Sequence, residues 1–122
     1  LMPNMRIKQG LNLQKISHDK QVIEAFKKDP LNHDRMSIRL AYSMVINGLW
    51  CIEHAMKLKI PTLLIHGDAD EFTSVEGSRL FANKAPAGLL TYKEWSGGFH
   101  ELHNEPNKME VLGFILSWLN KL

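Results

Sequence analysis

The chain has 122 residues and a mass of 14.0 kDa, of which 44% are hydrophobic and 23% charged, so we expect one globular domain with its own core. Its net charge of +2 is small and its lysines are scattered, which argues against a nucleic-acid or membrane surface as a partner. The single cysteine, Cys51, cannot form an internal disulfide and favours a reducing, cytoplasmic compartment. No apolar run approaches the roughly 18 residues of a membrane span.

The first half of the chain predicts two helices. Residues 1–12 show no clear period and predict a loop or a short extended segment. Ser17 is a plausible N-cap for a short amphipathic helix that ends at Asp29, before Pro30. Apolar residues recur every three to four positions over residues 36–56, which predicts the longest helix, with a possible break near Gly48.

The second half alternates strand and helix patterns. Residues 62–65 form an apolar run between Pro61 and Gly67, as in a strand buried on both faces of a parallel sheet. The stretch Thr73-Ser-Val-Glu76 has the form of a capping box and predicts a helix to about residue 85. Residues 89–95 predict a second strand and residues 107–119 a final helix.

Strand, helix and strand in this order predict a βαβ unit with parallel strands. Asp70 follows the first strand and His100 the second, so both side chains should lie at the shared carboxyl edge of the sheet. A carboxylate bonded to one imidazole nitrogen leaves the other nitrogen free to take a proton from a nucleophile. We therefore predict Asp70 and His100 as a catalytic acid and base.

Other roles remain open for these polar residues. Asp70 is also suited to a turn or to capping the following helix. His100 and His103 could bind a metal with Asp68 and Asp70, but their spacing is not that of two ligands on one helical face, so we predict no metal site. We expect Asp68 to be a turn residue and His66 a strand-end histidine with a hydrogen-bonded ring. Nothing assigns a task to His18, His33 or His54.

The expected nucleophile is not found in the sequence. The order nucleophile, acid, histidine is that of α/β-hydrolases, whose serine lies in a Gly-x-Ser-x-Gly turn. None of the seven serines here lies in such a turn. Two buried-type parallel strands are also unstable without more sheet beside them, so we expect a missing N-terminal half that carries the serine.

The segments His66-Gly-Asp-Ala-Asp70 and Phe99-His-Glu-Leu-His-Asn-Glu-Pro106 resemble the C-terminal half of the monoacylglycerol lipase and lysophospholipase group of α/β-hydrolases, also grouped with the serine aminopeptidases. The resemblance covers essentially the whole chain. It implies parallel strands with flanking helices, with residues 1–45 mostly helical cap and residues 46–122 part of the core. It also implies Asp70 as triad acid, His100 in Gly97-Gly-Phe-His100 as triad base, and no cofactor.

The activity implied by this resemblance is hydrolysis of carboxylic esters of lipids, with access to substrate at a membrane surface. Without its nucleophile the isolated chain is expected to be inactive. The alternative is a non-catalytic α/β fragment, or a degenerate hydrolase, that binds another chain or a second copy through its exposed sheet edge.

Overall fold

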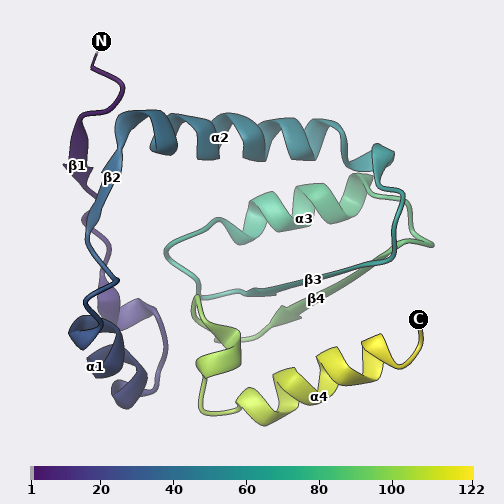
Figure 1. The fold of residues 1–122 in the computed structure, drawn as a ribbon. Helices are drawn as coiled ribbons and strands as arrows, with labels where there is room; N and C mark the ends of the chain where they lie inside the picture. Colours follow the sequence, from purple (N-terminus) through teal and green to yellow (C-terminus); the bar gives the residue numbers. More distant parts are fainter. Residues whose placement is uncertain (1) are drawn as a thin grey trace.

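The structure is a computed structural model that describes residues 2–122. Its elements follow one another along the chain as shown in Figure 1. They are β1 (Arg6–Lys8), η1 (Leu13–Lys15), α1 (Lys20–Lys28), β2 (Arg35–Ser37), α2 (Ile38–Glu53), η2 (Ala55–Lys57), β3 (Thr62–Gly67), α3 (Val75–Lys84), β4 (Leu90–Trp95), η3 (Leu102–Asn104) and α4 (Lys108–Leu119), where η marks a 3-10 helix.

The strands β3 and β4 pair in parallel, as predicted, with Thr62 opposite Leu90 and Gly67 opposite Trp95. Alternate residues of a strand point to opposite faces, and helices lie on both faces of this pair (Figure 1). On one face Arg79 of α3 binds both carboxylate oxygens of Glu94, at 2.9 and 2.8 Å. On the other face the Trp118 indole of α4 donates to the Thr91 hydroxyl. The sheet is therefore the middle layer between α3 and α4.

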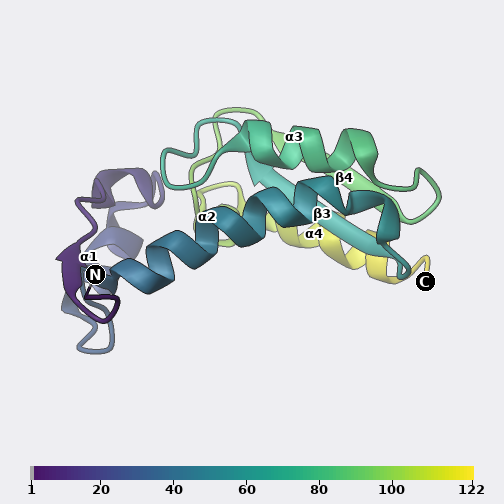
Figure 2. The same ribbon diagram turned by 90° about the horizontal axis from the view of Figure 1, so that it is seen from above.

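The N-terminal segment contains a ribbon that the sequence pattern did not predict. Strands β1 and β2 pair antiparallel, with Ile7 opposite Met36. Each strand is only three residues long, which is too short to show an alternating pattern. Figures 1 and 2 both show this ribbon and α1 at the end of the molecule where β3 and β4 finish. The described chain thus has four strands, where the sequence predicted two.

Two helix starts differ from the prediction. Helix α1 begins at Lys20, and its N-cap is Asp19, whose carboxylate accepts from the Gln21 N–H at 2.8 Å; Ser17 is buried and lies outside the helix. Helix α3 is capped by Ser74, whose hydroxyl accepts from the Gly77 N–H, so the capping box predicted from Thr73 is wrong by one residue. The Ser17 hydroxyl instead donates to the distant Asn104 carbonyl, and the Thr73 hydroxyl donates to the nearby Asp70 carboxylate.

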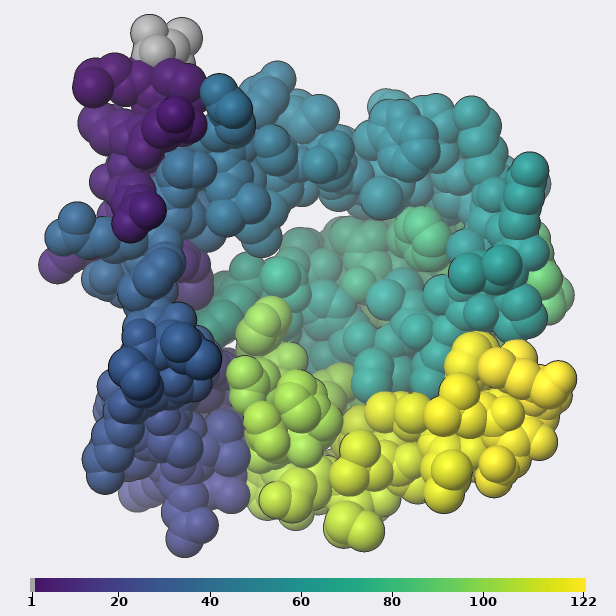
Figure 3. Space-filling view, viewed as in Figure 1, coloured from purple at the N-terminus to yellow at the C-terminus, as the bar shows by residue number. Residues whose placement is uncertain are grey.

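The helix predicted over residues 36–56 forms as α2, which continues without a break through Gly48. No residue of α2 is fully buried, although many of its side chains are large and apolar. Figure 3 shows an open gap directly beneath α2 on this face of the molecule. None of the helices among residues 2–122 is both long and apolar enough to cross a membrane.

The buried core is small for a chain of this length. Within residues 2–122 the buried apolar side chains are Ile16, Ile23, Ala55, Leu102 and Val111. Ile16 and Leu102 belong to two segments that meet at the carboxyl end of the sheet, since the Glu101 N–H donates to the Ile16 carbonyl at 2.9 Å. The predicted division at residue 45 falls inside α2, and it stays a prediction.

Candidate active site

The loops after β3 and β4 are bonded directly to each other. The Ala69 N–H donates to the Gly98 carbonyl at 3.1 Å, and the Asp68 N–H donates to the Trp95 carbonyl at 3.1 Å. The two loops come closest to each other at Gly67, where an added Cβ would lie only 2.6 Å from the Phe99 carbonyl oxygen. The absence of a side chain at Gly67 therefore allows the two loops, and the polar residues they carry, to meet.

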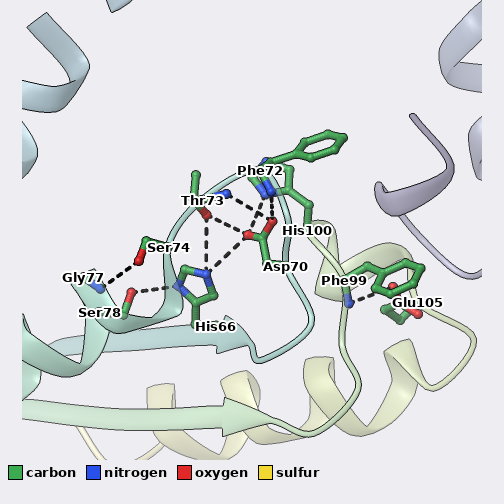
Figure 4. Close-up of polar contacts among 10 residues, drawn as sticks. All are labelled: His66, Asp70, Phe72, Thr73, Ser74, Gly77, Ser78, Phe99, His100 and Glu105. Atoms are coloured by element: carbon green, nitrogen blue, oxygen red, sulfur yellow. Dashed lines mark hydrogen bonds and ion pairs between the residues drawn. The ribbon is translucent and has the colours of Figure 1, made fainter. Parts of the chain in front are cut away.

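The carboxylate of Asp70 lies at the centre of a hydrogen-bond network (Figure 4). Its side chain is 3% exposed. Oδ1 accepts from the backbone N–H groups of Phe72 at 2.7 Å and of Thr73 at 3.2 Å. Oδ2 binds the Thr73 hydroxyl at 2.6 Å and lies 2.9 Å from Nδ1 of His100. Both oxygens of the carboxylate are thus held in fixed directions.

These contacts decide the charge of Asp70. Burial by itself would raise the pKa of Asp70. The hydrogen bonds from His100, from the Thr73 hydroxyl and from the two backbone N–H groups outweigh burial and lower that pKa to about 2. Asp70 is therefore ionised throughout the neutral range and accepts a hydrogen bond from the imidazole.

His100 is brought to Asp70 from the loop after β4, as the topology predicted, across 30 residues of sequence. Its side chain is 37% exposed, and its ring centroid lies 5.0 Å from that of Phe72. Because the ionised carboxylate can only accept, Nδ1 carries a proton, and in the neutral imidazole Nε2 is then unprotonated. A neutral His100 held this way has Nε2 free to accept a proton from a nucleophile.

His66 is a strand-end histidine with a hydrogen-bonded ring and Asp68 is a turn residue, as predicted. His66 lies near the end of β3, with its Nδ1 2.7 Å from the Ser78 hydroxyl and its Nε2 3.3 Å from Asp70 Oδ2 (Figure 4). Asp68 accepts from the Gly97 N–H at 2.6 Å and so ties the two loops together. Asp68 has no contact with His100 in this network.

The metal alternative has no support in the geometry of residues 2–122. No group of three or more His, Cys, Asp or Glu side chains in that range is arranged to hold a metal ion. His103 lies in η3, three residues beyond His100, and does not join the Asp70 network.

The sequence interpretation missed four polar residues around this pair. Thr73 follows Asp70 by three residues, the spacing at which an aspartate bonds the following turn, so a local signal was available. Ser78 is the fourth residue of α3, and no local sequence pattern indicates that it binds His66. Glu105 and His18 bind each other across 87 positions of sequence, with Glu105 Oε2 2.8 Å from His18 Nδ1, and no local pattern could reveal that contact.

A family model described as serine aminopeptidase, S33, matches residues 1–107 of this chain. The chain belongs to the serine aminopeptidase S33 family. It is 32% identical, over 99% of its length, to an uncharacterized abhydrolase domain-containing protein of Dictyostelium discoideum. It is 31% identical, over 91% of its length, to the monoacylglycerol lipase of Mycolicibacterium smegmatis. The resemblance predicted from the two motifs is confirmed.

The fold of this S33 family chain is also found in a solved relative. The crystal structure of Paleococcus ferrophilus monoacylglycerol lipase matches 98% of the chain with a TM-score of 0.92 and 31% identity. The predicted fold class, the C-terminal part of an α/β-hydrolase with parallel strands and flanking helices, is confirmed. The chain spans 13% and 40% of the two curated relatives and 47% of that crystal-structure chain.

Proposed function

We propose that Asp70 and His100 are the acid and base of a serine hydrolase triad that cleaves carboxylic esters of lipids. The single observation that supports this role is the 2.9 Å contact between His100 Nδ1 and Asp70 Oδ2 at the carboxyl edge of two parallel strands. The lipid substrate class is proposed from the monoacylglycerol lipases that the chain resembles.

In the proposed reaction, a serine hydroxyl donates its proton to His100 Nε2 as its oxygen attacks the ester carbonyl. Asp70 stays ionised and stabilises the imidazolium that forms. His100 then returns the proton to the leaving alcohol, which gives an acyl-enzyme. Water then attacks the acyl-enzyme while His100 takes its proton and passes it to the serine oxygen. This step releases the fatty acid and restores the serine hydroxyl.

The nucleophile is proposed to come from sequence outside these 122 residues, because none of the seven serines lies in a Gly-x-Ser-x-Gly turn. Two surfaces would receive that missing part. Each strand of the β3–β4 pair has one edge without a partner among the described residues. Helix α2 exposes Tyr42, Val45, Leu49 and Trp50, and a helix that is apolar on nearly all sides is normally covered.

A fusion tests this proposal. The part of the Mycolicibacterium smegmatis monoacylglycerol lipase that this chain does not match is joined to it, and hydrolysis of a monoacylglycerol is measured. Asp70→Asn and His100→Gln should each lower kcat by about 10³-fold or more. The matched controls Glu101→Gln and His103→Gln, in the segment that follows His100, should stay within a few-fold of the unsubstituted fusion. Equal rates for the test and control variants would refute the assignment.

The second candidate function is a binding module without catalysis. It is favoured by the same unpaired strand edges and by the exposed apolar side chains of α2. An inactive fusion, together with a defined dimer of the 122-residue chain in sedimentation analysis, would support association through this surface. A monomer that becomes active only in the fusion would support the hydrolase.

A further inference from the structure

Glu105 is a buried carboxylate that the triad chemistry does not use. It is 3% exposed and lies between η3 and α4. Its Oε1 accepts from the backbone N–H groups of Phe99 and His18, both at 3.3 Å. Its Oε2 lies 3.4 Å from the same His18 N–H and 2.8 Å from His18 Nδ1. A buried carboxylate is costly unless it is bonded in this way. These bonds hold the segment that ends at His18 against the loop that carries Phe99.

Residues 15–18 contact the loop at Phe99, His100 and Glu101. The His100 N–H donates to the Lys15 carbonyl at 3.5 Å, and the next N–H, of Glu101, donates to the Ile16 carbonyl at 2.9 Å. The rings of His18 and Phe99 stack with centroids 3.6 Å apart. Figure 4 shows Glu105 beside the backbone of Phe99, immediately before His100.

Ser17 adds a second contact to the same junction. Its hydroxyl donates to the Asn104 carbonyl at 2.8 Å and accepts from the Asp19 N–H at 2.9 Å. Ser17 is fully buried, so water does not compete for these groups. Residues 15–18 are therefore attached along the length of the loop that carries the proposed base.

We propose that Glu105 is a positioning residue that holds His100 in line with Asp70 by fixing the backbone of Phe99 against residues 15–18. This inference rests on the proposed function. Glu105 touches neither His100 nor Asp70 through its side chain, so it acts only through the loop. A displacement of about 1 Å is enough to impair a catalytic pair, and removal of this carboxylate would leave the N–H groups of Phe99 and His18 without their acceptor.

Glu101 provides a matched control in the same loop. Its carboxylate accepts from the Asn104 side-chain amide at 2.7 Å and contacts neither Phe99 nor His18. Glu101→Gln and Glu105→Gln therefore make the same chemical change four residues apart. Only the second change replaces an acceptor of the junction with an amide that brings two extra N–H donors.

The experiment follows the tautomer of His100 by nitrogen-15 NMR in the fusion enzyme, at a pH where the imidazole is neutral. The unsubstituted chain should carry the His100 proton on Nδ1, because Asp70 accepts there. Glu105→Gln should move part of the population to the Nε2–H tautomer, whereas Glu101→Gln should not. Circular dichroism establishes that each variant is folded, and Glu105→Asp replaces any Glu105→Gln that is not.

In the fusion enzyme, Glu105→Gln should lower kcat by about 10- to 100-fold with little change in KM, because the side chain contacts no substrate in the proposed reaction. A folded Glu105 variant that keeps the Nδ1–H tautomer and full kcat would overturn the positioning role alone. If instead the unsubstituted chain lacks the Nδ1–H tautomer, or Asp70→Asn leaves it unchanged, the proposed acid-base pair itself fails.

Discussion

Replacing Asp70 with asparagine should remove a pH-dependent part of the stability of this chain. Asparagine keeps a carbonyl oxygen for the Phe72 N–H but has no charge to attract His100. The carboxylate is 3% exposed, so solvent screens its interactions little. The loss should therefore appear in the free energy of unfolding and should depend on whether Asp70 is ionised.

The size of this effect follows from the pKa of Asp70, which falls from its ordinary value of 3.8 to about 2 in the folded chain. Each pKa unit corresponds to about 1.4 kcal/mol, so the ionised carboxylate stabilises the fold by about 2 kcal/mol at neutral pH. Because the folded pKa is depressed, this stabilisation is complete well above pH 3.8 and is lost as the pH falls through 2. At pH 3 about half of this stabilisation should remain.

Urea unfolding followed by circular dichroism at about pH 7 and about pH 3 measures this difference. The stability advantage of the unsubstituted chain over Asp70→Asn should shrink by about 1 kcal/mol between the two conditions. Val111→Ala is the control, because Val111 is fully buried and does not titrate. Its loss of unfolding free energy should therefore be similar at both pH values. An advantage over Asp70→Asn that is the same at both pH values would refute the electrostatic account of Asp70.

Two further substitutions test the loop contact and the helix cap. Gly67→Ala should destabilise the chain by about 1–3 kcal/mol in urea unfolding, because the new methyl group would overlap the Gly98 carbonyl. Gly48→Ala, in an open helical site, should instead stabilise it by about 0.5–1 kcal/mol, and equal effects at the two glycines would contradict the predicted overlap. Ser74→Ala should cost about 1 kcal/mol of stability through loss of the α3 cap. If Thr73→Ala lowered the helix content and Ser74→Ala did not, the N-cap would be Thr73, as the sequence predicted, and the observed cap at Ser74 would be refuted.

Much of the second half of the chain is predictable because its signals are local. Pro61 and Gly67 bound an apolar run that forms β3, and the final apolar period forms α4 within one residue of the expected start. The parallel order of strand, helix and strand then places Asp70 and His100 at one edge. The N-cap of α3 is not predictable in the same way, because Thr73 and Ser74 are adjacent hydroxyl residues and only the fold decides which of them faces the helix.

The sequence by itself determined the βαβ unit, because apolar periodicity is a local pattern, and the parallel direction of its two strands then placed Asp70 and His100 at one edge. Only the tertiary structure decided that Glu105 binds His18 and that β1 pairs with β2. Those contacts join segments that are far apart in sequence and carry no repeating pattern of their own. Glu105 meets His18 only because the N-terminal segment packs against the loop of His100, where the backbone N–H groups of His18 and Phe99 need an acceptor.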